Sequence, residues 1–118
     1  LFCKYYDPRK SKVRFIDSLV AKKTDTIADL IPRLNKMMGF TMDQPLLVYE
    51  EVKPSMVMSL KEFYSVQEAE LGNGDILVFQ QPVEVKDQMD DTMPFPSAVS
   101  YYDYIVNRIT VEFRLLDK

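Results

Sequence analysis

A helix with clear start and stop signals lies between segments of high β propensity, and this arrangement restricts the possible folds more than any other feature. Thr26 is a good N-cap, and Asp29 three residues later completes a capping box. Gly39 is a typical C-terminal stop. Pro32 falls in the interior, where it removes a backbone hydrogen bond and should bend the helix. Apolar residues recur between these signals at helical spacing: Ile27, Leu30, Ile31, Leu34 and Met37 or Met38.

Five other segments are rich in aromatic and β-branched residues and are predicted to be strands. The residues from Lys61 to Leu71 are expected to form a short helical turn or loop, and Gly72-Asn73-Gly74-Asp75 is a strong turn signal. The expected order is strand, strand, helix, strand, short strand, strand. The predicted strands are Phe2 to Tyr6, Lys12 to Val20, Pro45 to Val52, Met56 to Leu60 and Ile76 to Phe79.

The 118 residues suit one domain rather than two. Residues 1–82 are expected to form that domain, and residues 83–96 form an acidic, proline-containing linker. Residues 97–118 are predicted to form a helix from Ala98 to Asn107 and a strand from Ile109 to Leu116. This tail is too short to bury its own apolar face, so we expect it to join a neighbouring sheet or fold back. Because the chain opens at Leu1 without an initiator methionine, we expect a piece of a longer protein.

The residue inventory argues against an enzyme. The chain has no histidine and one cysteine, which removes Ser-His and Cys-His catalysis and most zinc sites. No phosphate-binding glycine loop is present, so we predict no catalytic residue, no metal and no cofactor. Cys3 is interpreted as a small buried hydrophobe in a reducing, intracellular compartment. No apolar run approaches the ~20 residues of a membrane helix, so no membrane partner is expected.

Charge is divided unevenly along the chain. Residues 1–40 contain nine basic and four acidic side chains, whereas residues 41–91 contain three basic and eleven acidic ones. This asymmetry predicts charged partner surfaces. The basic cluster of Arg9, Lys10, Lys12 and Arg14 falls on the first predicted turn and has no second basic stripe beside it. We interpret it as solvated hairpin charge and expect no nucleic-acid partner.

Several short strings resemble known proteins. Asp25-Thr26-Ile27, Gly39-Phe40, Asp43-Gln44 and the strand Leu46-Leu47-Val48-Tyr49 resemble ubiquitin, as do Leu60 and Tyr64. A closer resemblance, over residues 2–81, is to the herpesvirus-associated ubiquitin-specific protease family, in the second of its C-terminal ubiquitin-like domains. The tail resembles the start of the third such domain. The strings that carry this resemblance are Tyr6-Asp7-Pro8, Asp29-Leu30-Ile31-Pro32, Gly39-Phe40, Tyr49-Glu50-Glu51-Val52-Lys53-Pro54 and Gly74-Asp75-Ile76-Leu77-Val78-Phe79-Gln80.

The resemblance implies an α+β fold of the β-grasp, ubiquitin-like class with a C-terminal helix–strand extension. It also implies a non-catalytic module of a deubiquitinase, with the papain-like catalytic domain in another part of the same protein. The resemblance further implies an intracellular protein, in the nucleus, the cytoplasm or both. By this resemblance an acidic surface binds Lys/Arg-rich segments of partner proteins. The family's acidic patch maps onto Ala69, Glu70, Asn73 and Asp75, of which only Glu70 and Asp75 keep a carboxylate. With Glu68 as a neighbouring substitute, the expected partner-binding residues are Glu68, Glu70, Asn73 and Asp75.

Two alternatives stay open. The module could act inside its own chain, as a regulator or spacer of the catalytic domain. It could also mimic ubiquitin, since Val48 stands where ubiquitin has its central patch isoleucine, with Leu77 and Phe79 on the same outer face; the tail could equally cover that face. The string Phe79-Gln80-Gln81-Pro82 stands where a conjugated modifier would have Gly-Gly, so conjugation is not expected.

Overall fold

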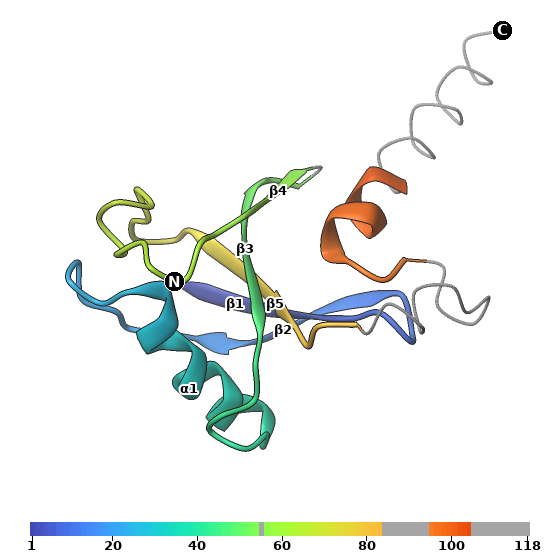
Figure 1. Ribbon diagram of the computed structural model, residues 1–118. Coiled ribbons are helices and arrows are strands. Elements are labelled where there is room, and N and C mark those ends of the chain that lie inside the picture. The colour runs from blue at the N-terminus through green and yellow to red at the C-terminus, as the bar shows by residue number, and fades with distance from the viewer. Residues whose placement is uncertain (55, 84–94, 105–118) are drawn as a thin grey trace, which may run out of the picture.

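A twisted five-stranded sheet carries a helix on one face and a C-terminal segment on the other (Figure 1). This computed structural model describes residues 1–54, 56–83 and 95–104. The strands lie in the order β2-β1-β5-β3-β4; β1 and β5 are parallel and the other neighbours antiparallel. The element order is the predicted one, and the α+β, ubiquitin-like fold class is confirmed. The elements are β1 (Phe2–Asp7), β2 (Lys12–Ser18), α1 (Ile27–Met38), β3 (Leu47–Lys53), β4 (Met56–Ser59) and β5 (Ile76–Gln80).

Helix α1 begins and ends where the sequence predicts. The Thr26 hydroxyl accepts a hydrogen bond of 3.2 Å from the Asp29 N–H, and the Asp29 carboxylate accepts one of 2.9 Å from the Thr26 N–H. Gly39 ends the helix in the left-handed conformation at φ 75°, which glycine adopts without steric cost. The helix continues through Pro32 to Met38.

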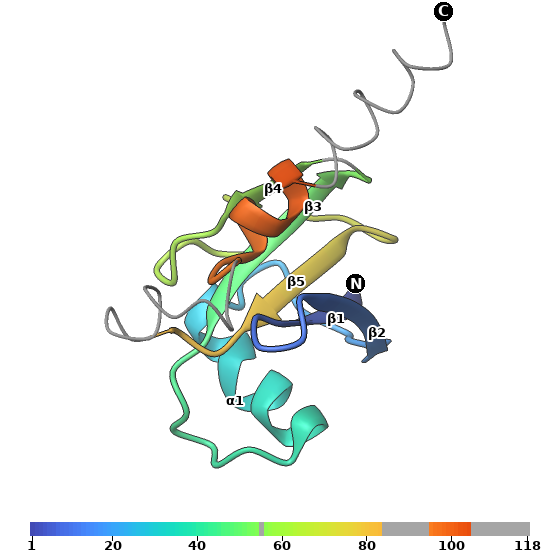
Figure 2. The same ribbon diagram turned by 90° about the vertical axis from the view of Figure 1, so that its right-hand side faces the viewer.

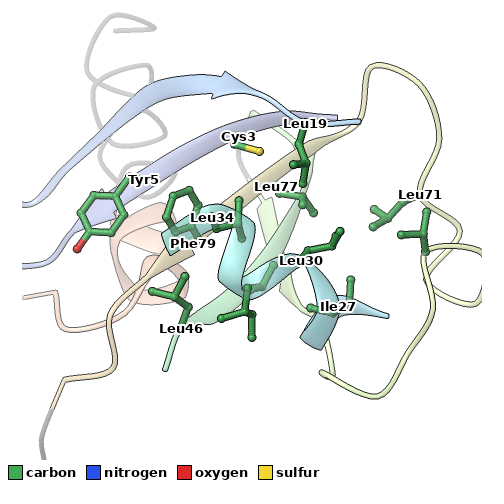
Figure 3. Packing of buried hydrophobic residues seen from close by; sticks show 13 residues of the cluster. Cys3, Tyr5, Leu19, Ile27, Leu30, Leu34, Leu46, Leu71, Leu77 and Phe79 are labelled. Atoms are coloured by element: carbon green, nitrogen blue, oxygen red, sulfur yellow. The ribbon is translucent and has the colours of Figure 1, made fainter. Parts of the chain in front are cut away.

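The main core lies between α1 and the sheet (Figure 3). Leu30 and Leu34 of α1 are fully buried against Leu77 and Phe79 of β5, with Val48 of β3 beside them. Burying each such side chain contributes about 1.5–3 kcal/mol to folding. The expectation that Val48, Leu77 and Phe79 lie on the outer face is therefore wrong. Successive strand residues alternate between faces, and these three point toward the helix.

A second, smaller core covers the outer face of the sheet, away from α1 (Figure 2). Tyr6, Tyr49 and Val78 are buried there against Ala98 and Tyr102. Residues 98–104 are helical, and we call residues 95–104 the outer strap. The strap covers the face that ubiquitin mimicry would need. The predicted strand from Ile109 to Leu116 and the end of the predicted tail helix lie outside the described residues.

Candidate functional site

The predicted partner-binding residues lie in and after the loop that joins β4 to β5. Glu68, Glu70 and Asn73 are exposed, and Asp75 is half-buried. Glu70 has a positive φ of 57° and its backbone N–H donates to the Gln67 carbonyl, so a tight turn orients this residue. Ala69, between Glu68 and Glu70, is only partly exposed, because its side chain packs against the main core.

Asp75 holds the turn that precedes β5. One of its carboxylate oxygens, Oδ2, accepts a hydrogen bond of 2.8 Å from the Gly72 N–H. The Asp75 backbone N–H donates to the Gly72 carbonyl at 3.2 Å, and its own carbonyl accepts from Phe2 N–H at 2.9 Å. Gly74 adopts a φ of 85° within the same turn. Asp75 therefore has a fixed position, and Asn73 lies exposed on the turn that it closes.

The structure adds Glu50 to this group of carboxylates. Glu50 lies on β3 and pairs with Leu77 of β5. Leu77 follows Asp75 by two residues, so Glu50 lies near the start of β5. Partial burial raises the pKa of Glu50, and the nearby charges of Asp75 and Glu70 raise it further. Mutual repulsion of this kind is typical of carboxylates that share one region of space. We define the acidic surface as Glu50, Glu70 and Asp75.

Glu68 is less closely tied to this surface. It is exposed, and its backbone N–H donates to the Ser65 hydroxyl at 3.0 Å. The charges that raise the pKa of Glu50 are those of Asp75 and Glu70, and Glu68 is not among them. The structure thus brings Glu70 and Asp75 together, with Glu68 and Asn73 at the margin. Sequence reasoning missed Glu50 because twenty or more residues separate it from Glu70 and Asp75. Local sequence carries no signal for this long-range contact.

Cys3 lies in the main core, with no exposed surface. Burial raises the pKa of its thiol to about 11, so the thiol is protonated at neutral pH. The interpretation of Cys3 as a buried hydrophobe agrees with this placement. Among the residues that the structure describes, no group of three or more His, Cys, Asp or Glu side chains could hold a metal ion. Within the same residues, no helix has both the length and the apolar character needed to cross a membrane.

Polar contacts fix the outer strap at its start. The Gln80 side chain is completely buried, and its oxygen accepts hydrogen bonds from the Ala98 N–H at 2.8 Å and the Tyr49 hydroxyl at 3.0 Å. The Gln80 side-chain nitrogen donates to the Pro96 carbonyl at 3.0 Å. The Tyr6 hydroxyl donates to the Phe95 carbonyl. One strand side chain thus satisfies two backbone groups of the strap.

Further along the strap, the Tyr102 hydroxyl donates to the Glu51 carboxylate at 2.6 Å. The Lys4 ammonium lies 3.2 Å from the same carboxylate. Burial raises the pKa of Tyr102, and the hydrogen bond to Glu51 and the charge of Glu51 raise it further. These contacts hold the strap against the sheet.

The strand order and the helix define a ubiquitin-like module, and comparison with solved structures supports this class. The C-terminal ubiquitin-like domain of mouse tubulin-specific chaperone e superposes with a TM-score of 0.53 at 16% identity, covering 71% of this chain and 86% of that domain. At that identity the likeness shows the fold alone. The model of the ICP0-binding domain of Ubiquitin-specific protease 7 matches residues 1–118. The chain belongs to this family.

Curated relatives agree with the family. Ubiquitin C-terminal hydrolase 13 of Arabidopsis thaliana is 31% identical over 100% of this chain, which corresponds to 11% of its own length. Ubiquitin carboxyl-terminal hydrolase 5 of Schizosaccharomyces pombe is 32% identical over 97% of this chain and 10% of its own. Ubiquitin carboxyl-terminal hydrolase 7 of Drosophila melanogaster is 29% identical over 96% of this chain and 10% of its own length. The chain thus spans about a tenth of the length of these relatives.

Proposed function

We propose that this chain is a non-catalytic docking module of a deubiquitinase, and that its acidic surface binds Lys/Arg-rich segments of partner or substrate proteins. The placement of Glu50 on β3 near Asp75 and Glu70 of the β4–β5 loop carries the proposal: burial raises the pKa of Glu50, and the charges of Asp75 and Glu70 raise it further. A bound cation would relieve the repulsion and favour the ionised form of Glu50. Glu68 and Asn73 border the same loop and would contact the flanks of such a segment.

The partner chemistry follows from the charges that are present. None of the three carboxylates lies within ion-pair distance of a Lys or Arg among the described residues. Single exposed ion pairs contribute only ~0–1 kcal/mol, so several must act together and the complex must weaken with added salt. Complementary charge of this kind accelerates encounter and selects partners more than it adds affinity. The matching family is that of the ICP0-binding domain of Ubiquitin-specific protease 7, and partner binding by that protein supports a docking role in general.

The test is titration of a fluorescein-labelled oligolysine peptide with the chain, followed by fluorescence anisotropy. Glu70→Gln removes one charge from the acidic surface and should weaken binding about threefold to tenfold. Glu62→Gln is the matched control, because Glu62 is exposed on the same loop and is not among the charges acting on Glu50. Equal affinities for the two variants would reject the acidic surface as the binding site.

A second candidate function is that of an intramolecular regulator or spacer for the catalytic domain of the same chain. The outer strap favours it, because its hydrogen bonds to Gln80 and Glu51 fix the strap relative to the sheet. In this view the region after residue 96 begins a following ubiquitin-like module, and residues 83–96 connect it to the domain of residues 1–82. Ubiquitin-cleavage rates of the parent enzyme with and without residues 1–118 test the idea, and unchanged rates would reject it.

The relatives are ubiquitin hydrolases, which supports a parent protein that is a cysteine-type ubiquitin-specific protease. The parent would act inside the cell, in the nucleus, the cytoplasm or both. In that setting the catalytic cysteine belongs to another part of the parent protein, since Cys3 is buried and protonated.

A further inference from the structure

Strand β2 (Lys12–Ser18) forms one end of the sheet. In the described part of the chain it pairs with β1 alone, so the backbone groups along its other edge have no strand partner. Such an edge can accept an additional extended chain, which gains backbone hydrogen bonds from it. Natural edges of this kind carry charged residues that prevent unspecific pairing, and the charges on this edge are mainly positive.

A hollow lies beside the C-terminal end of β2, between that end and helix α1. Its volume is about 650 Å³. Val20 and Met42 contribute apolar surface and are unusually exposed, at 86% and 57%. Arg33 and Lys36 of α1 supply the basic rim. An apolar hollow with a basic rim fits an apolar side chain that has acidic neighbours.

A second hollow, of about 410 Å³, lies at the opposite end of the strand. Lys10, Lys12 and Arg14 line it together with Val13 and Tyr101, the last from the outer strap. The Asp7 carboxylate also faces this hollow, where it accepts hydrogen bonds from the Arg9 and Lys10 N–H groups and so fixes the turn. The first hollow lies on the α1 side of the sheet and the second on the strap side, one near each end of β2.

The charges along this edge are largely unpaired. Within the described residues, Lys10, Lys12, Arg14 and Lys36 have no carboxylate at ion-pair distance, whereas Arg33 lies 3.9 Å from Asp25. The carboxylate of Asp17 on β2 accepts from the Ser18 N–H and is the acidic group within the strand itself. Basic side chains therefore outnumber acidic ones along the edge, five against three when Asp7, Asp17 and Asp25 are counted.

We propose that the β2 edge is a second docking surface, which binds an extended protein segment that contains both acidic and apolar residues by adding it to the sheet as a further strand. The free strand edge and the apolar hollow favour a polypeptide over a nucleic acid, whose phosphates would meet a chain of net charge −3. This inference goes beyond the proposed function and does not rest on it. The acidic surface lies on the β4–β5 loop and β3 and would bind basic segments. The β2 edge would bind acidic segments.

The test uses the 118-residue chain, ¹⁵N-labelled, and a short capped peptide of alternating glutamate and valine. We expect amide shifts along β2 and at Arg33, Lys36 and Met42. A peptide of the same sequence with N-methylated backbone amides cannot complete a strand ladder and should lose binding. The double variant Arg14→Glu, Lys36→Glu should raise the Kd about tenfold. Glu62→Gln, at an exposed position outside both proposed surfaces, should leave the Kd unchanged.

Other outcomes would overturn the proposal. Binding that survives N-methylation would mean charge attraction without strand addition. A single-stranded oligonucleotide that binds the β2 edge more tightly than the peptide would assign the surface to another class of ligand. Absence of shifts on β2 with intact spectra would reject the site. None of these results affects the oligolysine titration, so the two proposed surfaces are tested independently.

Discussion

The side-chain oxygen of Gln80 accepts the backbone N–H of Ala98 at 2.8 Å, and this contact joins the last strand of the sheet to the outer strap. Both residues are completely buried. This bond holds the strap against the outer face of the sheet, of which the strap covers a part.

Replacing Gln80 should destabilise the module strongly. Gln80→Ala leaves the Tyr49 hydroxyl, the Ala98 N–H and the Pro96 carbonyl without their partner, and buried unpaired groups cost about 1–3 kcal/mol each. We expect a loss of about 3 kcal/mol in the free energy of unfolding, measured by urea denaturation. Gln67→Ala, at an exposed position, is the control and should be neutral. A Gln80 variant as stable as this control would mean that the strap is not fastened there.

The hydroxyl of Tyr102 should contribute measurably to strap attachment. Tyr102→Phe removes the bond to Glu51 but keeps the ring in place, and Lys4 continues to pair with that carboxylate. Hydrogen bonds to charged groups contribute about 1.5–3 kcal/mol, and we expect the lower end. Tyr104→Phe is matched in chemistry, at a residue 42% exposed, and should change the unfolding free energy little. Similar values for both variants would contradict the contact.

Glu50 should make stability depend on pH in a defined direction. Its pKa is raised in the folded state by burial and then by Asp75 and Glu70, so the folded chain binds this proton more tightly than the unfolded chain. Its contribution therefore improves as pH falls through the raised pKa toward the ordinary glutamate value. Glu50→Gln should stabilise the chain at pH 7 and lose that advantage near pH 4, in thermal unfolding at both pH values. A variant that is less stable than the parent at pH 7 would show that Glu50 has a favourable partner.

The Cys3 thiol should react slowly while the chain is folded. It is fully buried and its pKa is about 11, so both access and thiolate fraction are low at pH 7.5. Labelling by iodoacetamide, followed by mass spectrometry, should proceed only through unfolding and accelerate sharply in urea. Rapid labelling in the absence of denaturant would contradict the core placement.

The helix and the order of the elements along the chain could be predicted because their sequence signals are local. Thr26, Asp29 and Gly39 act on neighbouring backbone groups, so their consequences are readable from spacing. The assignment of Val48, Leu77 and Phe79 to the outer face was wrong because a shift of one residue exchanges the two faces of a strand.

The acidic surface and the strap depend on contacts that sequence spacing does not reveal. Glu50 comes near Glu70 and Asp75 only through the pairing of β3 with β5, across twenty or more residues. The bond between Gln80 and Ala98 likewise needs the chain to return over the sheet. Long-range juxtapositions of this kind follow from the packed fold, and local propensity carries no signal for them.

The central claim is best tested by NMR chemical shifts of the ¹⁵N-labelled chain, titrated with a lysine-rich peptide at about 50 mM and about 300 mM NaCl. Docking on the acidic surface predicts shifts that cluster at Glu50, Glu70 and Asp75 and extend to Glu68 and Asn73. The same peptide should bind much more weakly at the higher salt concentration. Shifts elsewhere on the chain, or binding that is indifferent to salt, would contradict the account.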